Sequence, residues 1–165
     1  MDLTRRVGIR NCTRRLLLSG PAGFLLSVGL SGTNSILKGG YVNLIMKIKQ
    51  IEKNHTLCAV VQSDDVVITD TQSALDLLMT ANYEIGTKNI AIDKTLITED
   101  FFVLRTGLAG EILQKYINYG GRIAIYGDYA CYTSKSLHDF IYESNQGNDV
   151  FFVATEEDAI NVLTR

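Results

Sequence analysis

The 165-residue sequence has no tryptophan, one proline, two histidines and three cysteines. Cysteines and histidines this few and this scattered form neither a zinc-binding motif nor a disulfide framework, and their scarcity suits a reducing compartment. The formal net charge is −2, so the chain lacks the overall positive field of a nucleic-acid-binding protein. No uninterrupted apolar run reaches the ~18 residues that a membrane span requires. We therefore expect a cytoplasmic protein that contacts neither nucleic acid nor a membrane.

Charge divides the chain into two regions. Residues 1–44 carry six basic residues and one acidic residue, a net charge of +5, whereas residues 45–165 carry 10 basic and 17 acidic residues, a net charge of −7. The single proline, Pro21, and seven glycines interrupt any regular element in the first region. We interpret residues 1–44 as a basic extension, disordered or non-native, in front of a domain that spans residues 46–165. A targeting peptide and a functional basic arm are the alternatives for the first region.

The pattern of residues 46–165 predicts an α/β domain. Alternating residues at 47–52, the polar turn Asn54-His55 and the apolar run 57–61 predict a β-hairpin at one edge of a sheet. Further strands are expected at 66–69, 89–92, 122–126 and 150–154. Because helices separate most of these strands, right-handed crossovers should make the inner sheet mostly parallel. The order β-β-β-α-β-α-β-α-β-α gives a mixed sheet with about four helices.

Capping residues and glycines predict where the helices begin and end. The expected first residues are Asp70 or Thr71, then Thr98, then Thr133 or Ser134, and finally Thr155. The second helix is the clearest, because apolar residues recur at helical spacing from residue 98 to residue 119. Gly107 and Gly110 lie inside it and mark the place for a kink or a break.

Catalytic and ligand-binding residues of an α/β domain are expected at strand ends and in glycine-rich motifs. No strand is followed by G-x-G-x-x-G and no P-loop occurs, which disfavours nucleotide binding of those types. Asp70, Asp93 and Asp128 follow predicted strand ends, at the edge of an α/β sheet where ligands usually bind. Carboxylates grouped there would suit Mg²⁺, so a Mg²⁺-dependent phosphoryl-transfer or hydrolytic enzyme is the alternative function. The simpler interpretation is that each aspartate caps a helix or a turn.

The loop after the strand at 122–126 is a further candidate. Tyr126, Tyr129 and Tyr132 cluster around it, and Ser134 and Lys135 follow. Aromatic hydroxyl groups in such a loop favour a pocket or a protein interface, with partly buried packing residues as the alternative interpretation. This loop and the turn at Thr98 are together the best place for a site.

Five stretches of the chain are specific enough to compare with known families. They are Ile68–Leu77 (ITDTQSALDL), Ile97–Phe102 (ITEDFF), Leu108–Lys115 (LAGEILQK), Tyr132–Leu137 (YTSKSL) and Asp139–Asn145 (DFIYESN). Together they resemble a family of small bacterial proteins known as domain of unknown function number four-one-eight-zero. The resemblance covers about residues 46–165 and has no counterpart in residues 1–44. The family has no established activity, so the resemblance implies no catalytic residues.

The element order also resembles, at a distance, the STAS fold of anti-sigma-factor antagonists. Such proteins act by binding a partner, commonly a switch kinase, and many are controlled by phosphorylation of a Ser or Thr that begins the helix after the central strand. The resemblance implies that Thr98, or Thr95, is the phosphoacceptor. Asp93-Lys94-Thr95-Leu96 stands where such proteins usually have D-x-S-G.

These observations predict a STAS-like regulatory module in residues 46–165 that binds a protein partner and needs no cofactor. We expect a binding module more than an enzyme. The candidate interaction loop consists of Glu99, Asp100, Tyr129, Tyr132, Thr133, Ser134 and Lys135.

Overall fold

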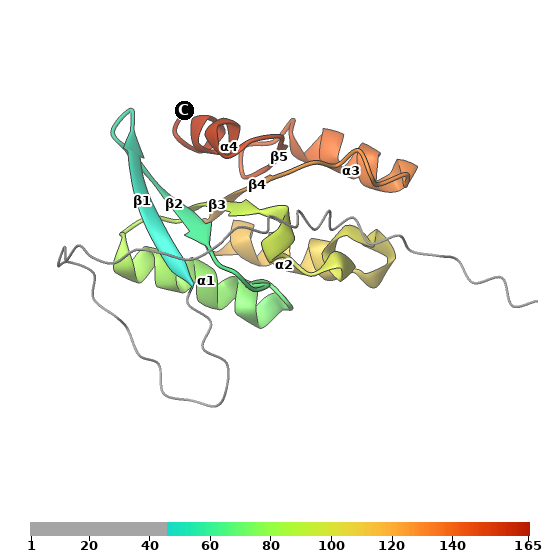
Figure 1. Cartoon of the computed structure of the whole chain (residues 1–165), viewed down its shortest axis with the longest axis horizontal. Coiled ribbons are helices and arrows are strands. Elements are labelled where there is room, and N and C mark those ends of the chain that lie inside the picture. Colours follow the sequence, from blue (N-terminus) through green and yellow to red (C-terminus); the bar gives the residue numbers. More distant parts are fainter. Residues whose placement is uncertain (1–45) are drawn as a thin grey trace, which may run out of the picture. The chain divides into compact units, whose positions relative to one another are not determined.

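The computed structural model describes residues 46–165, which form a five-stranded sheet and four α-helices (Figure 1). The interpretation of residues 1–44 as a disordered or non-native extension lies outside the described residues. The strands are β1 (Lys47–Lys53), β2 (Thr56–Gln62), β3 (Asn89–Asp93), β4 (Arg122–Tyr126) and β5 (Val150–Val153). The α-helices are α1 (Thr71–Glu84), α2 (Leu108–Asn118), α3 (Lys135–Ser144) and α4 (Glu156–Leu163). Three short 3-10 helices, η1 (Lys94–Leu96), η2 (Glu99–Phe102) and η3 (Leu104–Thr106), connect β3 to α2.

The sheet has the order β1-β2-β3-β4-β5, in which β1 pairs antiparallel with β2 and the other pairs are parallel. Asn54 and His55 form the turn between β1 and β2 with φ angles of 52° and 61°, the left-handed conformation of a tight two-residue hairpin turn. The helices α1, α2 and α3 each return the chain to the start of the next parallel strand. The predicted mixed α/β fold, with a hairpin at its edge and four helices, is confirmed.

The two faces of the sheet carry side chains of different size. Ala91 and Ala124 lie on the face that α4 covers, and such small residues let this helix approach the strands closely. Isoleucines of β3 and β4 line the other face and pack with buried residues of α1, α2 and α3. Figure 1 shows α4 on one side of the sheet and α1 and α2 on the other. Each fully buried aliphatic side chain contributes ~1.5–3 kcal/mol, so the strands form a firm support for the loops at their ends.

Residues 66–69 do not form the expected third strand. The N–H groups of Val67 and Ile68 both donate to the Leu96 carbonyl oxygen, at 2.8 and 3.0 Å. The Thr98 N–H donates to the Ile68 carbonyl oxygen at 2.8 Å, and an isolated parallel bridge joins Ile68 to Ile97. Because β2 already occupies the place beside β3, this short apolar run stays outside the sheet. It instead fixes the position of the chain around Thr98.

The helix expected over residues 98–119 is divided at Gly107, one of the two glycines that marked the place for a kink or a break. Residues 99–102 and 104–106 form 3-10 helices, and α2 begins at Leu108. Gly107 lies at the break with a φ of 79°, a left-handed conformation that glycine adopts without the steric cost of a side chain. Thr98 precedes only a short 3-10 helix, and its hydroxyl makes no capping bond there. The prediction that Thr98 caps a long helix is therefore wrong.

The other three helices begin where the sequence predicts. Asp70, Ser134 and Thr155 are the N-caps of α1, α3 and α4, and each accepts a hydrogen bond from the backbone N–H three residues later. These bonds satisfy amide groups that a helix start leaves without partners. Among the described residues, no helix combines the length and the apolar character needed to cross a membrane.

Arg122 closes the amino end of the sheet, where β2–β5 begin. Its Nη1 and Nη2 atoms donate to the carbonyl oxygens of Leu163 and Val162 at 3.0 and 3.1 Å, which satisfies the last turn of α4. Its guanidinium group lies 5.6 Å from the centroid of the Phe151 ring. One side chain thus connects β4, β5 and the end of α4.

Candidate functional site

Two loops meet at the carboxyl end of the sheet, where β2–β5 finish. One is the β3–α2 segment, residues 94–107, and the other is the β4–α3 loop, residues 127–134. The Tyr132 hydroxyl donates to Glu99 Oε2 at 3.0 Å across a separation of 33 residues in sequence. The rings of Phe102 and Tyr132 stack with their centroids 5.2 Å apart. These two contacts join the loops.

An aromatic cluster beneath these contacts holds the β4–α3 loop. The Tyr129 ring centroid lies 6.3 Å from that of Phe102, and the Tyr129 hydroxyl donates to the Ile125 carbonyl oxygen at 2.9 Å. Burial raises the pKa of Tyr129 and of Tyr132, and the Glu99 carboxylate raises the pKa of Tyr132 further. Both hydroxyl groups therefore remain protonated and act as hydrogen-bond donors at neutral pH.

Lys94 completes the cluster from the β3–α2 segment. Its Nζ atom lies 4.8 Å from the Tyr132 ring centroid and 5.9 Å from the Tyr129 ring centroid, within the range of a cation–π attraction. Gly127 leaves room for this side chain, since a Cβ atom there would lie 2.7 Å from Lys94 Cγ. The φ of 151° at Gly127 also favours glycine. The position of Lys94 thus depends on the absence of a side chain at residue 127.

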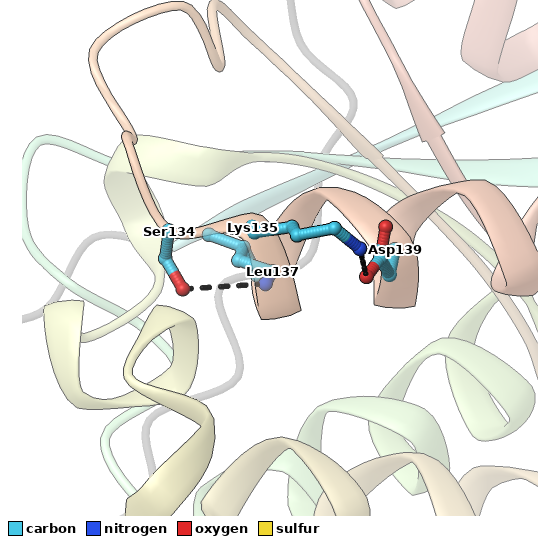
Figure 2. A network of polar contacts seen from close by, with 4 residues as sticks. All are labelled: Ser134, Lys135, Leu137 and Asp139. Atoms are coloured by element: carbon cyan, nitrogen blue, oxygen red, sulfur yellow. Dashed lines mark hydrogen bonds and ion pairs between the residues drawn. The ribbon is translucent and has the colours of Figure 1, made fainter.

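Five polar side chains around this cluster are exposed, and we call them the carboxyl-end surface: Glu99, Asp100, Thr133, Ser134 and Lys135. Figure 2 shows two of them at the start of α3, where Ser134 Oγ accepts a bond from the Leu137 N–H and Lys135 pairs with Asp139. The hydrogen bond and the charge of Asp139 raise the pKa of Lys135. The surface therefore presents both signs of charge next to two hydroxyl groups.

The predicted tyrosine cluster is only partly assembled. Tyr129 and Tyr132 support the carboxyl-end surface, but Tyr126 packs on the opposite face of the sheet, beside the residues that α4 covers. The Tyr126 hydroxyl lies 3.4 Å from Glu156 Oε2. Burial, together with the carboxylates of Glu156 and Asp93, raises the pKa of Tyr126 to about 12. Tyr126 therefore belongs to the junction between β4 and α4.

The two candidate phosphoacceptors differ in their hydrogen bonds. Thr95 is exposed, and its hydroxyl donates to Asp93 Oδ1 at 2.6 Å, the same oxygen that accepts the Thr95 N–H at 2.7 Å. Thr98 is half-buried, and its hydroxyl is not used in a helix cap. Both residues lie in the β3–α2 segment, close in sequence to the exposed Glu99 and Asp100.

The structure does not gather Asp70, Asp93 and Asp128 into one site. Asp70 accepts bonds from Ser73, which lower the pKa of its carboxyl group, and caps α1. Asp93 caps η1, and Asp128 accepts a bond from the Ala130 N–H at 2.8 Å. Across residues 46–165, no three carboxylate, imidazole or thiol groups lie close enough together to hold a metal ion. Each aspartate instead serves the turn in which it lies.

Sequence analysis gave no site role to Lys94, Phe102 or Gly127. The His138 Nε2 atom lies 2.8 Å from the Tyr132 carbonyl oxygen and so holds the end of the β4–α3 loop. For Gly127 the sequence did contain a signal, because this glycine directly follows a predicted strand. No sequence signal shows that Lys94 lies against rings more than thirty residues away, because the contact depends on the parallel pairing of β3 with β4.

Comparison with protein-family models identifies the family of this chain. The model of a family described as a domain of unknown function, DUF4180, matches residues 53–163. The chain belongs to this family. The DUF4180 match begins at the last residue of β1 and ends at the last residue of α4, so it includes every residue of the carboxyl-end surface. The resemblance stated from the sequence is confirmed.

Comparison with solved structures and curated proteins gives less information. A Thermotoga maritima protein assigned as an anti-sigma factor antagonist is similar over 73% of this DUF4180 chain and 96% of its own, with 13% identity and a TM-score of 0.37. No curated protein matches the sequence. The function proposed for this DUF4180 domain therefore rests on its own geometry.

Proposed function

We propose that residues 46–165 form a regulatory module that binds a protein partner through the carboxyl-end surface. One observation carries the proposal: the Tyr132–Glu99 bond joins two loops that are distant in sequence and leaves charged side chains exposed at their rim. A surface that is ordered before binding loses little conformational entropy when it binds. Such order in the two loops favours recognition of a partner.

The composition of the surface indicates what the partner should present. Glu99 and Asp100 are adjacent acids, whereas Lys135 lies at the start of α3 with its charge shared with Asp139. Polar rims around an aromatic centre are typical of protein interfaces, and Tyr132 supplies an aromatic ring at this place. A partner with basic side chains opposite Glu99 and Asp100 would fit the surface best.

Phosphorylation of Thr98 or Thr95 is the proposed control. A phosphate adds a charge of about −2 at neutral pH. On Thr98 it would lie beside two acids and repel Glu99, and on Thr95 it would replace a favourable bond to Asp93 with repulsion. Either modification would change the charge and the shape of the carboxyl-end surface, and the binding of a partner with it.

Site-specific cross-linking tests the binding surface. The full chain carrying a photoreactive benzoylphenylalanine in place of Thr133 should capture a partner in its own cells. The same residue in place of Tyr83, which is exposed near the end of α1 and belongs to neither proposed binding surface, should not. Glu99→Lys should abolish the adduct at position 133 while the fold persists by circular dichroism. Equal adducts at both positions, or an adduct unaffected by Glu99→Lys, would contradict the proposal.

Intact mass spectrometry tests the control. The full chain purified from its own cells should include a form heavier by one phosphate, and either Thr98→Val or Thr95→Val should remove that form. If the added mass never occurs, or survives in both variants, phosphorylation at these residues is wrong. The cross-linking result would still decide the binding surface independently.

A further inference from the structure

The two edges of the sheet differ in whether they can accept another strand. The carbonyl oxygens of Asp149 and Val153 accept bonds from the N–H groups of Ile123 in β4 and of Gly127 directly after it, so the backbone of Phe152 points away from β4. Asn145 occupies that outer side, because its Nδ2 donates to the Phe152 carbonyl oxygen at 3.0 Å and its Oδ1 accepts the Phe152 N–H at 2.7 Å. The side chain of Asn145 thus closes the β5 edge in the way a neighbouring strand would.

The β1 edge has no such closure in the described part of the chain. This strand has seven residues, whereas β5 has four, and its strand partner among residues 46–165 is β2 alone. A long edge strand with free backbone groups is a template for pairing with another chain. What that chain must look like depends on the side chains of β1.

Three lysines of β1 share one face of the sheet. The register places Lys49 and Ile51 opposite residues that α4 covers, and the two-residue period of a strand adds Lys47 and Lys53 to the same face. All three lysines are exposed, and within residues 46–165 no carboxylate forms an ion pair with them. We call Lys47, Lys49 and Lys53 the lysine row. The lysine row concentrates positive charge on one strand, although residues 45–165 together carry a net charge of −7.

The lysine row argues against a second copy of this chain as the added strand. Antiparallel pairing of two β1 strands about Gln50 would set Lys47 directly opposite Lys53 at both ends. Like charges directly opposite each other destabilise a strand pair. An acidic strand would instead place opposite charges at all three lysines of the row.

We propose that β1 accepts an extended acidic segment of a partner protein as a sixth, antiparallel strand. Acidic residues would lie opposite the lysine row, and an apolar residue would lie opposite Ile51. Backbone hydrogen bonds supply affinity in this mode of recognition, and side chains at alternate positions supply specificity. The segment thus reads acidic-x-apolar-x-acidic-x-acidic from its amino end. This interaction uses a different part of the molecule from the carboxyl-end surface and does not rest on the function proposed there.

The test uses the ¹⁵N-labelled full chain and an acetylated, amidated peptide of sequence ETVTETE, with KTVTKTK as the control peptide. The acidic peptide should shift the backbone amide signals of β1, and the basic peptide should not. Lys49→Glu should weaken binding of the acidic peptide about tenfold, because an attraction becomes a repulsion. The matched control is Lys115→Glu, the same charge change at an exposed position of α2, which should leave binding unchanged. Binding should also weaken between about 50 and about 300 mM salt, because screening shortens the reach of the charges.

Three outcomes would overturn the proposal. If the acidic peptide leaves the β1 amides unshifted at millimolar concentration, the lysine row only keeps other strands away. If KTVTKTK binds as well as ETVTETE, charge does not select the segment. Two copies of ETVTETE can be N-methylated, one at each of the two alternating sets of amides. If both methylated peptides bind as well as the parent peptide, the attraction is electrostatic and no strand is added.

Discussion

The amino and carboxyl ends of the sheet use their polar side chains in different ways. At the amino end, side chains bind backbone: Thr87 Oγ1 and Asn89 Nδ2 both donate to the Leu57 carbonyl oxygen, at 2.8 and 2.9 Å. At the carboxyl end, side chains also bind one another near solvent, as Tyr132 binds Glu99 and Thr95 binds Asp93. A bond to a buried carbonyl satisfies a group that folding removes from water, whereas a bond between exposed side chains mainly sets their orientation. The first end therefore maintains stability, and the second maintains a surface.

The largest expected effect is at the amino end. Arg122→Ala removes the donors to the last carbonyl groups of α4 and the cation over Phe151. Bonds from a charged donor contribute ~1.5–3 kcal/mol, so we expect a loss of about 3 kcal/mol in the free energy of unfolding, measured by urea denaturation. Arg122→Lys should lose nearly as much, because an ammonium group cannot match the planar fork of a guanidinium. A loss below about 1 kcal/mol would remove the contrast between the two ends.

Gly127→Ala is the corresponding change at the carboxyl end. The new Cβ atom would lie 2.7 Å from Lys94 Cγ at a φ that side chains rarely adopt, so Lys94 should leave the Tyr132 ring. Strain of this kind costs ~1–3 kcal/mol, and we expect a loss of about 2 kcal/mol. The adduct formed by benzoylphenylalanine at position 133 should decrease as well, which Arg122→Lys should not cause in the folded protein.

Gly110→Ala is the matched control for that substitution. Gly110 lies in α2 with nothing within 4 Å of the position of its Cβ atom, and alanine favours the helix by roughly 0.5–1 kcal/mol. The same chemical change should therefore stabilise the protein slightly and leave cross-linking unaffected. If the two glycine variants lose stability equally, close contact with Lys94 is not the cause.

How much of the fold could be predicted depends on whether an element is determined by neighbouring residues or by distant ones. The α/β order, the hairpin and the caps at Asp70, Ser134 and Thr155 follow from local patterns, because each depends on residues within a few positions of one another. The run 66–69 has the composition of a strand, but a strand needs a free neighbour, and β2 already pairs with β3. The helix over residues 98–119 has an apolar period across Gly107, and the period alone does not show that Gly107 takes a positive φ.

The site could be predicted only as a region. Sequence analysis placed it in the turn at Thr98 and in the tyrosine loop, since both follow strands whose parallel pairing brings their ends together. It did not separate Tyr126 from Tyr129 and Tyr132, because Tyr126 is the last residue of β4 and packs on the α4 side. Nor could it find the Lys94–Tyr132 contact, which exists only after β3 and β4 have paired.

Alkaline pH should lower the free energy of unfolding by a smaller amount, through the ionisation of Tyr126 at the end of β4. The pKa of Tyr126 is raised to about 12 in the fold from an ordinary value of 10, so its neutral form is favoured when folded. Its contribution to stability is therefore complete below pH 10 and is lost as the pH rises through about 12. Tyr126→Phe should reduce the decline in unfolding free energy over this range by about 1–2 kcal/mol, after allowance for solvent screening. An identical decline in wild type and variant would show that the half-buried Tyr126 phenol does not make stability depend on pH.

Lys135→Ala should have the smallest effect on stability and is the sharpest test of what the carboxyl end does. Lys135 is fully exposed and its pair with Asp139 lies on the surface of α3, and exposed ion pairs contribute little to folding. Urea denaturation should thus not distinguish the variant from wild type, while cross-linking from position 133 should decrease. Asp139→Asn breaks the same pair but keeps the lysine charge, so it should retain the adduct. A fall in stability with Lys135→Ala, or equal loss of the adduct in both variants, would mean that the ion pair serves the fold and that the two ends of the sheet do not differ as argued.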